Sequence, residues 1–231
     1  MFKSNLEEWK LEMFDAVIFD WDGTLADTKW AVVNSFQKVL KEIGCKVSDR
    51  LIERKIGMGA KATFEDALKT AKMPFNDEMI SMLVEKKVEA QLKLTDEVKL
   101  FEGTIELLNS LHNKVRMGLA SMNNRAVIYR LLTQKGVMVY FDVVITVEEV
   151  LYPKPNPEIF LKCARRLRCR PERCVVLEDS VFGVQAAKNA NMKCIAISSG
   201  AYSEKELTEQ KPDLIFASMA EKEKILGFIL G

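Results

Sequence analysis

Residues 14–28 read Phe14-Asp15-Ala16-Val17-Ile18-Phe19-Asp20-Trp21-Asp22-Gly23-Thr24-Leu25-Ala26-Asp27-Thr28. The apolar run predicts a buried strand that delivers two carboxylates, Asp20 and Asp22, into a glycine turn. Ligands bind at the carboxyl ends of strands in open α/β sheets, and residues two apart in an extended segment share a face. Because two close carboxylates repel unless a proton or a cation intervenes, the pattern indicates Mg²⁺-assisted phosphoryl transfer. Taken alone, it also fits a plain acidic turn after a strand, so the rest of the chain has to decide.

Composition narrows the classes of function. The chain has 231 residues, of which 48% are hydrophobic. That is enough for a large core, as one domain or as a core with a smaller insert. Thirty-four basic and 33 acidic residues leave a net charge of +1, so no global field points to nucleic acid or to a membrane surface. We therefore expect neither as a partner.

The cysteines and the N-terminal residues indicate the cellular compartment of the protein. Five cysteines without a Cys-x-x-Cys pair, together with one histidine, favour neither a disulfide framework nor a zinc module. Residues 1–12 lack the long apolar core of a signal peptide. No run approaches the roughly 18 apolar residues of a membrane span. These features predict a reducing, cytoplasmic setting.

Short apolar runs alternate with helical patterns over most of the chain. The predicted strands are residues 16–20, 115–121, 142–146, 174–179, 193–198 and 213–217, and the predicted helices among them are 104–113, 125–136, 156–167 and 181–191. This alternation predicts an α/β fold with a doubly wound, mostly parallel, Rossmann-like sheet. Residues 27–98 interrupt it with helix after helix, including 29–43 and 77–92. We therefore expect an all-helical domain, 27–98, inserted into a core made of residues 1–26 and 99–231.

Three later segments also carry polar residues at chemically useful places. An apolar strand in residues 115–125 ends at Ser121, residues 153–160 hold Lys154 between two prolines, and the strand in residues 174–187 ends in acids. Each has a purely structural explanation: a helix cap, a surface lysine in a proline-rich loop, and a helix N-terminus favoured by the dipole. Taken alone, each of these segments is weak evidence for chemistry.

The four segments together resemble the four signatures of the haloacid dehalogenase (HAD) superfamily. The matches are Asp20-x-Asp22-Gly-Thr-Leu-x-Asp27-Thr28, the strand ending at Ser121, Lys154-Pro-x-Pro-x-x-Phe160, and Glu178-Asp179-Ser180. The resemblance covers essentially the whole chain after residue 13. It is to the helical-cap (C1) subgroup, near β-phosphoglucomutase and phosphoglycolate phosphatase, and it implies that the helical insert is a cap.

The resemblance implies a role for each matching residue. Asp20 would be the nucleophile that forms an aspartyl-phosphate, and Asp22 the general acid and base. Ser121 would hydrogen-bond the phosphoryl group, with backbone amides of a helix start near Met122 and Asn123 reinforcing anion binding. The Lys154 ammonium would balance the charge of Asp20 and of the phosphate.

The metal and the leaving group would use further residues. The resemblance implies a Mg²⁺ shell of Asp20, Asp179 and the Asp22 backbone carbonyl, with Glu178 as an outer or secondary ligand. The cap loop around Gly57 and Lys61 lies where the family contacts the leaving group, although Lys61 fits a solvated lysine as well. Arg125 would either reach the phosphate or lie exposed.

Three functions remain open on the sequence. The first is a Mg²⁺-dependent phosphatase of a small phosphorylated metabolite, such as a sugar phosphate or phosphoglycolate. The second is a sugar phosphomutase, whose family pattern is not met because residues 30–36 contain no histidine and Ile56 precedes Gly57. The third is a non-catalytic protein that binds a phosphometabolite or a partner. A monomer and a homodimer are both compatible with the sequence, and the amphipathic residues 6–14 could pack on the core or on a partner.

Overall fold

The central strand of the sheet is β1, Ala16–Phe19, in the computed structural model, which describes residues 14–231. All four of its side chains are buried. Burial on both faces is why this strand reads as an unbroken apolar run rather than as an alternating pattern. Val17 and Phe19 pack into one hydrophobic cluster, and Ala16 and Ile18 pack into another on the opposite face.

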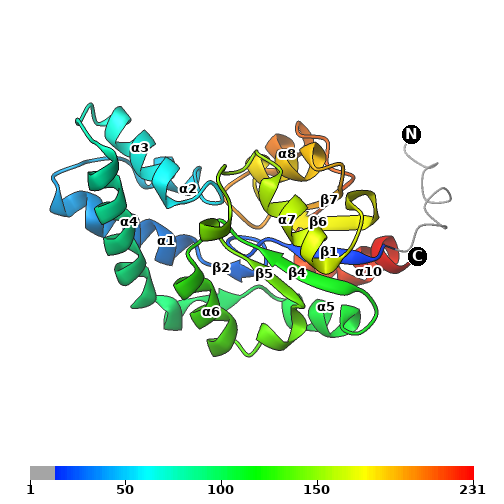
Figure 1. Ribbon diagram of the computed structural model, residues 1–231. Coiled ribbons are helices and arrows are strands. Elements are labelled where there is room, and N and C mark those ends of the chain that lie inside the picture. Colours follow the sequence, from blue (N-terminus) through cyan, green and yellow to red (C-terminus); the bar gives the residue numbers. More distant parts are fainter. Residues whose placement is uncertain (1–13) are drawn as a thin grey trace.

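Six parallel strands form the main sheet (Figure 1). The other five are β4 (Arg116–Ala120), β5 (Val143–Ile145), β6 (Cys174–Glu178), β7 (Lys193–Ile197) and β8 (Leu214–Phe216). Their order in the sheet is β5-β4-β1-β6-β7-β8. Each lies where the sequence predicts a strand, so the doubly wound sheet is confirmed. Because β4 and β6 flank β1, the strand order reverses there, and a crevice opens at its carboxyl end.

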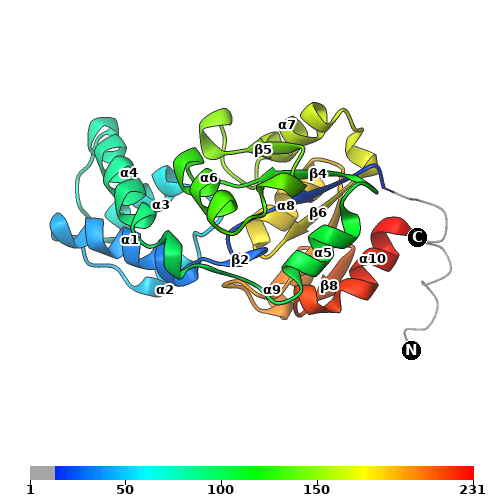
Figure 2. The same ribbon diagram turned by 90° about the horizontal axis from the view of Figure 1, so that it is seen from below.

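Helices cover both faces of this sheet (Figures 1 and 2). On one face lie α5 (Thr104–Leu111), α6 (Arg125–Gln134) and α10 (Lys222–Leu230), and on the other α7 (Glu158–Leu167), α8 (Val181–Asn189) and α9 (Glu204–Thr208). The two apolar layers fix β1 and its neighbours in place. Side chains at the carboxyl ends of the strands therefore project from a rigid base.

The chain after β1 forms a helical insert that packs around a third hydrophobic cluster of its own. It contains α1 (Lys29–Glu42), α2 (Asp49–Glu53), α3 (Ala60–Thr70) and α4 (Asp77–Leu92). In its centre the rings of Phe36 and Phe64 lie 4.7 Å apart. The insert is joined to the rest by two short strands, β2 (Ala26–Asp27) and β3 (Lys99–Leu100), which pair antiparallel. Figure 2 shows the insert beside the end of the sheet at which β1 terminates.

The structure corrects one helix start. The helix expected from residue 156 begins at Glu158. Asn156 instead precedes it, and its side-chain oxygen accepts a hydrogen bond of 3.0 Å from the Glu158 N–H. Ser180 caps α8, because its hydroxyl accepts a hydrogen bond from the Gly183 N–H.

Some expectations concern residues that the structure does not describe. Residues 6–13 of the amphipathic N-terminal stretch lie outside the described residues, as does the start of the core segment 1–26. Within residues 14–231, no helix has the length and apolar character needed to cross a membrane. All five cysteines are in this part of the chain and are free thiols.

Candidate active site

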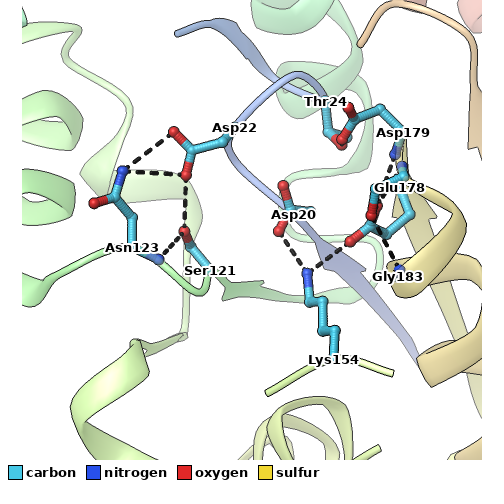
Figure 3. A network of polar contacts seen from close by, with 10 residues as sticks. Asp20, Asp22, Thr24, Ser121, Asn123, Lys154, Glu178, Asp179 and Gly183 are labelled. Atoms are coloured by element: carbon cyan, nitrogen blue, oxygen red, sulfur yellow. Dashed lines mark hydrogen bonds and ion pairs between the residues drawn. The ribbon is translucent and has the colours of Figure 1, made fainter. Parts of the chain in front are cut away.

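Asp20 and Lys154 meet at the carboxyl end of β1. Asp20 directly follows the strand, and its N–H donates to the Leu177 carbonyl of β6. The Lys154 ammonium is fully buried and donates to Asp20 Oδ1 and to Glu178 Oε1, each at 2.6 Å (Figure 3). A buried lysine between two carboxylates is held by charge from both sides, so these three side chains act as one electrostatic unit.

Burial and charge work against each other in this unit. Burial disfavours the Lys154 ammonium, but the carboxylates of Asp20 and Glu178 outweigh it and raise the pKa of Lys154. Burial raises the pKa of Asp20, and the Lys154 ammonium acts in the opposite direction. The carboxylates of Glu178 and Asp22 add to the effect of burial, and together these influences raise the pKa of Asp20 to about 8. The lysine therefore does not compensate the negative charge of the site by itself.

Both oxygens of Glu178 have partners within the protein. Oε1 accepts from Lys154, and Oε2 accepts from the N–H groups of Asp179 and Ser180, each at 2.8 Å, and from the Ser180 hydroxyl at 2.9 Å. The Glu178 carboxylate thereby orients Lys154 and the start of α8, and its role as an outer or secondary metal ligand stays a prediction. An outer role beside a metal is compatible with these contacts.

Asp179 is held in a pocket of glycines. Its Oδ1 accepts a hydrogen bond of 2.9 Å from the Thr24 hydroxyl. A methyl group at Gly23 or at Gly200 would overlap the Asp179 carboxylate, so both positions need the smallest residue. Burial raises the pKa of Asp179, and the carboxylates of Glu178 and Asp20 add to this rise.

The donor set fits a hard divalent cation. Asp20 Oδ2 is buried and has no hydrogen-bond partner, which leaves a carboxylate oxygen free for a ligand. Four buried carboxylates, those of Asp20, Asp22, Glu178 and Asp179, share the site with the single ammonium of Lys154. In residues 14–231 no group of three or more His, Cys, Asp or Glu side chains is arranged to hold a metal. The expected set uses only two side chains, Asp20 and Asp179, and completes the shell with a backbone carbonyl of Asp22.

Asp22 contacts Ser121 and Asn123 rather than the residues around Lys154. Its Oδ2 accepts from the Ser121 hydroxyl at 3.3 Å, and both of its oxygens accept from Asn123 Nδ2 at 3.2 Å (Figure 3). Ser121 therefore contacts the expected acid and base, Asp22. The Asn123 N–H donates to the Ser121 hydroxyl, and α6 begins only at Arg125, so Met122 and Asn123 lie in the turn before the helix rather than at its start.

A cavity of about 120 Å³ opens over Asp22 from the helical insert. Its polar lining comprises Asp22, Lys55, Lys61, Thr63, Lys87, Asn123 and Asn124. Gly57 and Met122 line it too. The Lys61 side chain is 66% exposed and pairs with Asp77 at 3.3 Å.

The structure does not bring Arg125 to this cavity. Its guanidinium pairs with Glu149 at 3.3 Å and is half exposed, and Arg125 is not among the residues that line the cavity. Of the two alternatives for Arg125, reaching the phosphate or lying exposed, this position fits the exposed one.

Sequence reasoning missed Lys87. Its side chain is buried, and its ammonium donates to Gln91 Oε1 at 2.5 Å and to Asn123 Oδ1 at 3.4 Å. A signal was present, because the buried positions of α4 are Ile80, Leu83, Lys87, Ala90 and Gln91. This spacing defines one face of a helix, so Lys87 and Gln91 are polar residues on the apolar stripe.

The fold and the site define a class of protein: an α/β enzyme with a carboxylate-rich centre beneath a helical insert. A family model described as haloacid dehalogenase-like hydrolase matches residues 17–197. The chain therefore belongs to the haloacid dehalogenase-like hydrolase family.

Relatives narrow the reaction type. The chain is 30% identical over 187 residues to a fructose-1-phosphate phosphatase of Escherichia coli, covering 80% of this chain and 97% of that protein. It is also 30% identical over 184 residues to hexitol phosphatase B of Escherichia coli, covering 79% and 82%. Both of these relatives are named phosphatases, and the chain is an enzyme of the phosphoric monoester hydrolase type.

Solved structures share the whole architecture. CbbY from Rhodobacter sphaeroides, solved in complex with phosphate, is 28% identical with a TM-score of 0.81, covering 90% of this chain and 96% of that chain. A β-phosphoglucomutase from Clostridium difficile is 24% identical with a TM-score of 0.84, covering 94% and 97%, and shares the fold.

Proposed function

We propose that this protein is a Mg²⁺-dependent phosphatase that hydrolyses a small phosphorylated metabolite, of the sugar phosphate or phosphoglycolate type, through an aspartyl-phosphate on Asp20. The observation that carries the proposal is the pairing of Asp20 with the buried Lys154, with the second oxygen of Asp20 left without a protein partner. An oriented carboxylate with one free oxygen is a suitable nucleophile.

The reaction needs one nucleophile and one group that moves protons. A carboxylate oxygen of Asp20 attacks the phosphorus, and the bond from phosphorus to the ester oxygen breaks while Asp22 gives that oxygen a proton. In the second half, water attacks the phosphorus, Asp22 takes a proton from it, and the bond to Asp20 breaks to release phosphate. Asn123 and Ser121 keep Asp22 oriented through both steps.

The metal would be held by Asp20, Asp179 and the Asp22 backbone carbonyl, with Glu178 outside the shell. A bound Mg²⁺ would screen the negative charge that the phosphate adds to these carboxylates. Lys154 supplies the fixed positive charge on the opposite side of Asp20.

Residues 27–98 would form the cap domain over a core of residues 1–26 and 99–231. The leaving group would occupy the cavity that Asp22 lines, with Gly57, Lys61 and Met122 among its walls. The partner would be a small metabolite, without nucleic acid or membrane, and the setting cytoplasmic. A monomer and a homodimer remain equally compatible with this site, because all of its residues come from one chain.

The test is phosphate release from a panel of small phosphate esters, with and without Mg²⁺, by the wild type and by Asp20→Asn. We expect release that requires both the metal and Asp20. Full turnover by Asp20→Asn would rule out Asp20 as the nucleophile. Conversion of a sugar 1-phosphate to its 6-phosphate without release would assign the protein to the mutases instead.

A further inference from the structure

Lys87 is a buried charge with no counter-charge in contact. Two lysines are buried in the described part of the chain, Lys154 and Lys87. Lys154 pairs with two carboxylates, whereas both hydrogen bonds of Lys87 go to neutral amide oxygens. A buried ammonium usually requires an ionic partner, so its retention beside the cavity needs an explanation.

The other cations near the cavity are already paired. Lys55 contacts Asp66 at 2.5 Å, Lys61 contacts Asp77 at 3.3 Å, and both side chains are partly exposed. Lys87 lines the same cavity and also comes from the insert, but it differs from these two lysines because it is buried and its hydrogen-bond partners carry no charge. The Lys87 ammonium also lies over the Phe36 ring, 5.2 Å from the ring centroid, and this cation–π contact stabilises it further.

The hydrogen bonds of Lys87 leave one donor over. An ammonium has three N–H donors, and Gln91 and Asn123 accept two of them. The remaining cavity wall around it is largely apolar, with Val32, Phe36, Val84, Val88 and Met122. The third N–H of Lys87 therefore lacks an acceptor among these residues, and an oxygen of a bound molecule would supply one.

We propose that Lys87 is the specificity-determining residue of the insert, and that its third N–H binds an oxygen, hydroxyl or carboxylate, carried by the leaving group next to the ester carbon. The inference rests on the proposed function, because it assumes that the leaving group occupies the cavity over Asp22. It predicts that the enzyme selects phosphate esters of polyols, sugars or hydroxy acids over plain alkyl phosphates.

A second role for Lys87 makes a different prediction. Its bond to Asn123 Oδ1 helps fix that amide, whose Nδ2 in turn holds Asp22. If Lys87 acted only through Asn123, its loss would slow turnover of every ester to the same extent. It would also leave the relative affinities of different esters unchanged.

The experiment measures the dissociation constants of two phosphate esters for each of two protein variants, by calorimetry with Mg²⁺ present. The esters are glycerol 3-phosphate and propyl phosphate, which differ only in the hydroxyls, and the proteins are Asp20→Asn and Asp20→Asn/Lys87→Met. Phosphoglycolate and ethyl phosphate form a second pair that tests a carboxylate. The matched control is Asp20→Asn/Lys86→Met, since Lys86 lies next in sequence and forms a surface pair with Glu42.

We expect Asp20→Asn to bind the oxygen-bearing ester of one pair or both about 10- to 100-fold more tightly than its alkyl counterpart. Lys87→Met should remove that preference, and Lys86→Met should keep it. The pair that shows the effect identifies the hydroxyl or the carboxylate as the group recognised. Equal affinities within both pairs, or a preference that survives Lys87→Met, would overturn the inference. Both outcomes are measured as binding and not as turnover. Phosphate release by the wild type therefore remains a separate test of the proposed function.

Discussion

The Lys154 ammonium pairs with two buried carboxylates at once, so its removal has a large expected cost. In Lys154→Met, Asp20 and Glu178 stay buried without their shared partner. We expect the free energy of unfolding to fall by about 3–5 kcal/mol and turnover to fall by at least about 1000-fold. Urea unfolding and phosphate release measure the two effects. The control is Lys224→Met, which removes an exposed pair with Glu221 and should cost at most about 1 kcal/mol; equal losses in both variants would contradict the assignment.

Lys87 should behave in the opposite way in stability measurements. Burial lowers its pKa from 10.5 to about 8, against the charge of Asp22, which acts to raise it. The unfolded chain therefore binds more protons between pH 8 and 10.5, and this residue destabilises the fold below that window. Lys87→Met should raise the free energy of unfolding at pH 7, by on the order of 3 kcal/mol at most, with a smaller gain at pH 10. A loss of stability at pH 7 that is absent in Lys86→Met would show that the ammonium stabilises the fold.

At this scale, sequence reasoning identified the residues that carry local signals. Asp20, Asp22, Lys154 and Asp179 stand at strand ends or between prolines, and the structure brings them together. Lys87 has no such local signal, because the pattern of residues 77–92 predicts a helix but does not mark which of its charged residues is buried. Its partner Asn123 lies 36 residues away, and a contact across that separation exists only once the insert has docked.

Two helical glycines offer a test of how an element supports the site. A methyl group at Gly183 in α8 would overlap the Glu178 carboxylate, whereas one at Gly227 in α10 has nothing within 4 Å. Gly183→Ala should therefore displace Glu178, weaken its hold on Lys154 and lower turnover at least about tenfold. Gly227→Ala should raise the free energy of unfolding by roughly 0.5–1 kcal/mol, as expected for alanine in a helix. Thermal unfolding and phosphate release compare the pair, and normal activity of Gly183→Ala would mean that Glu178 is not a positioning group.

The elements that were predicted correctly are those with long apolar signals. All six strands of the main sheet are confirmed, since strands buried on both faces leave runs of apolar residues. The pair β2 and β3 was missed because two residues are too few to show any period. The start of α7 was placed two residues early because Asn156 and Pro157 match a helix start, whereas the loop that positions Lys154 extends through both.

For the whole molecule, the metal should act as a stabilising ligand. A ligand that binds only the folded state at 100 times its dissociation constant adds about 2.7 kcal/mol to the free energy of unfolding. We expect Mg²⁺ to raise the thermal midpoint of the wild type and not that of Asp179→Asn. Without Mg²⁺, Asp179→Asn should be at least as stable as the wild type, because burial and the neighbouring carboxylates raise the pKa of Asp179 and its charge is unfavourable at neutral pH. Equal Mg²⁺ shifts in both proteins would place the metal elsewhere.

The junction between the insert and the sheet has a consequence for how such a chain can be altered. In β2 and β3, Ala26 lies opposite Leu100 and Asp27 opposite Lys99. Opposed residues of antiparallel strands have Cα atoms only about 5 Å apart, a gap that a two-residue hairpin turn closes. The chain thus leaves and re-enters the sheet at nearly one point. Exchanging or deleting the helical insert would therefore leave the connections between the strands of the main sheet unchanged. An insert from another enzyme could then change the substrate selectivity while the catalytic residues of the sheet stay in place.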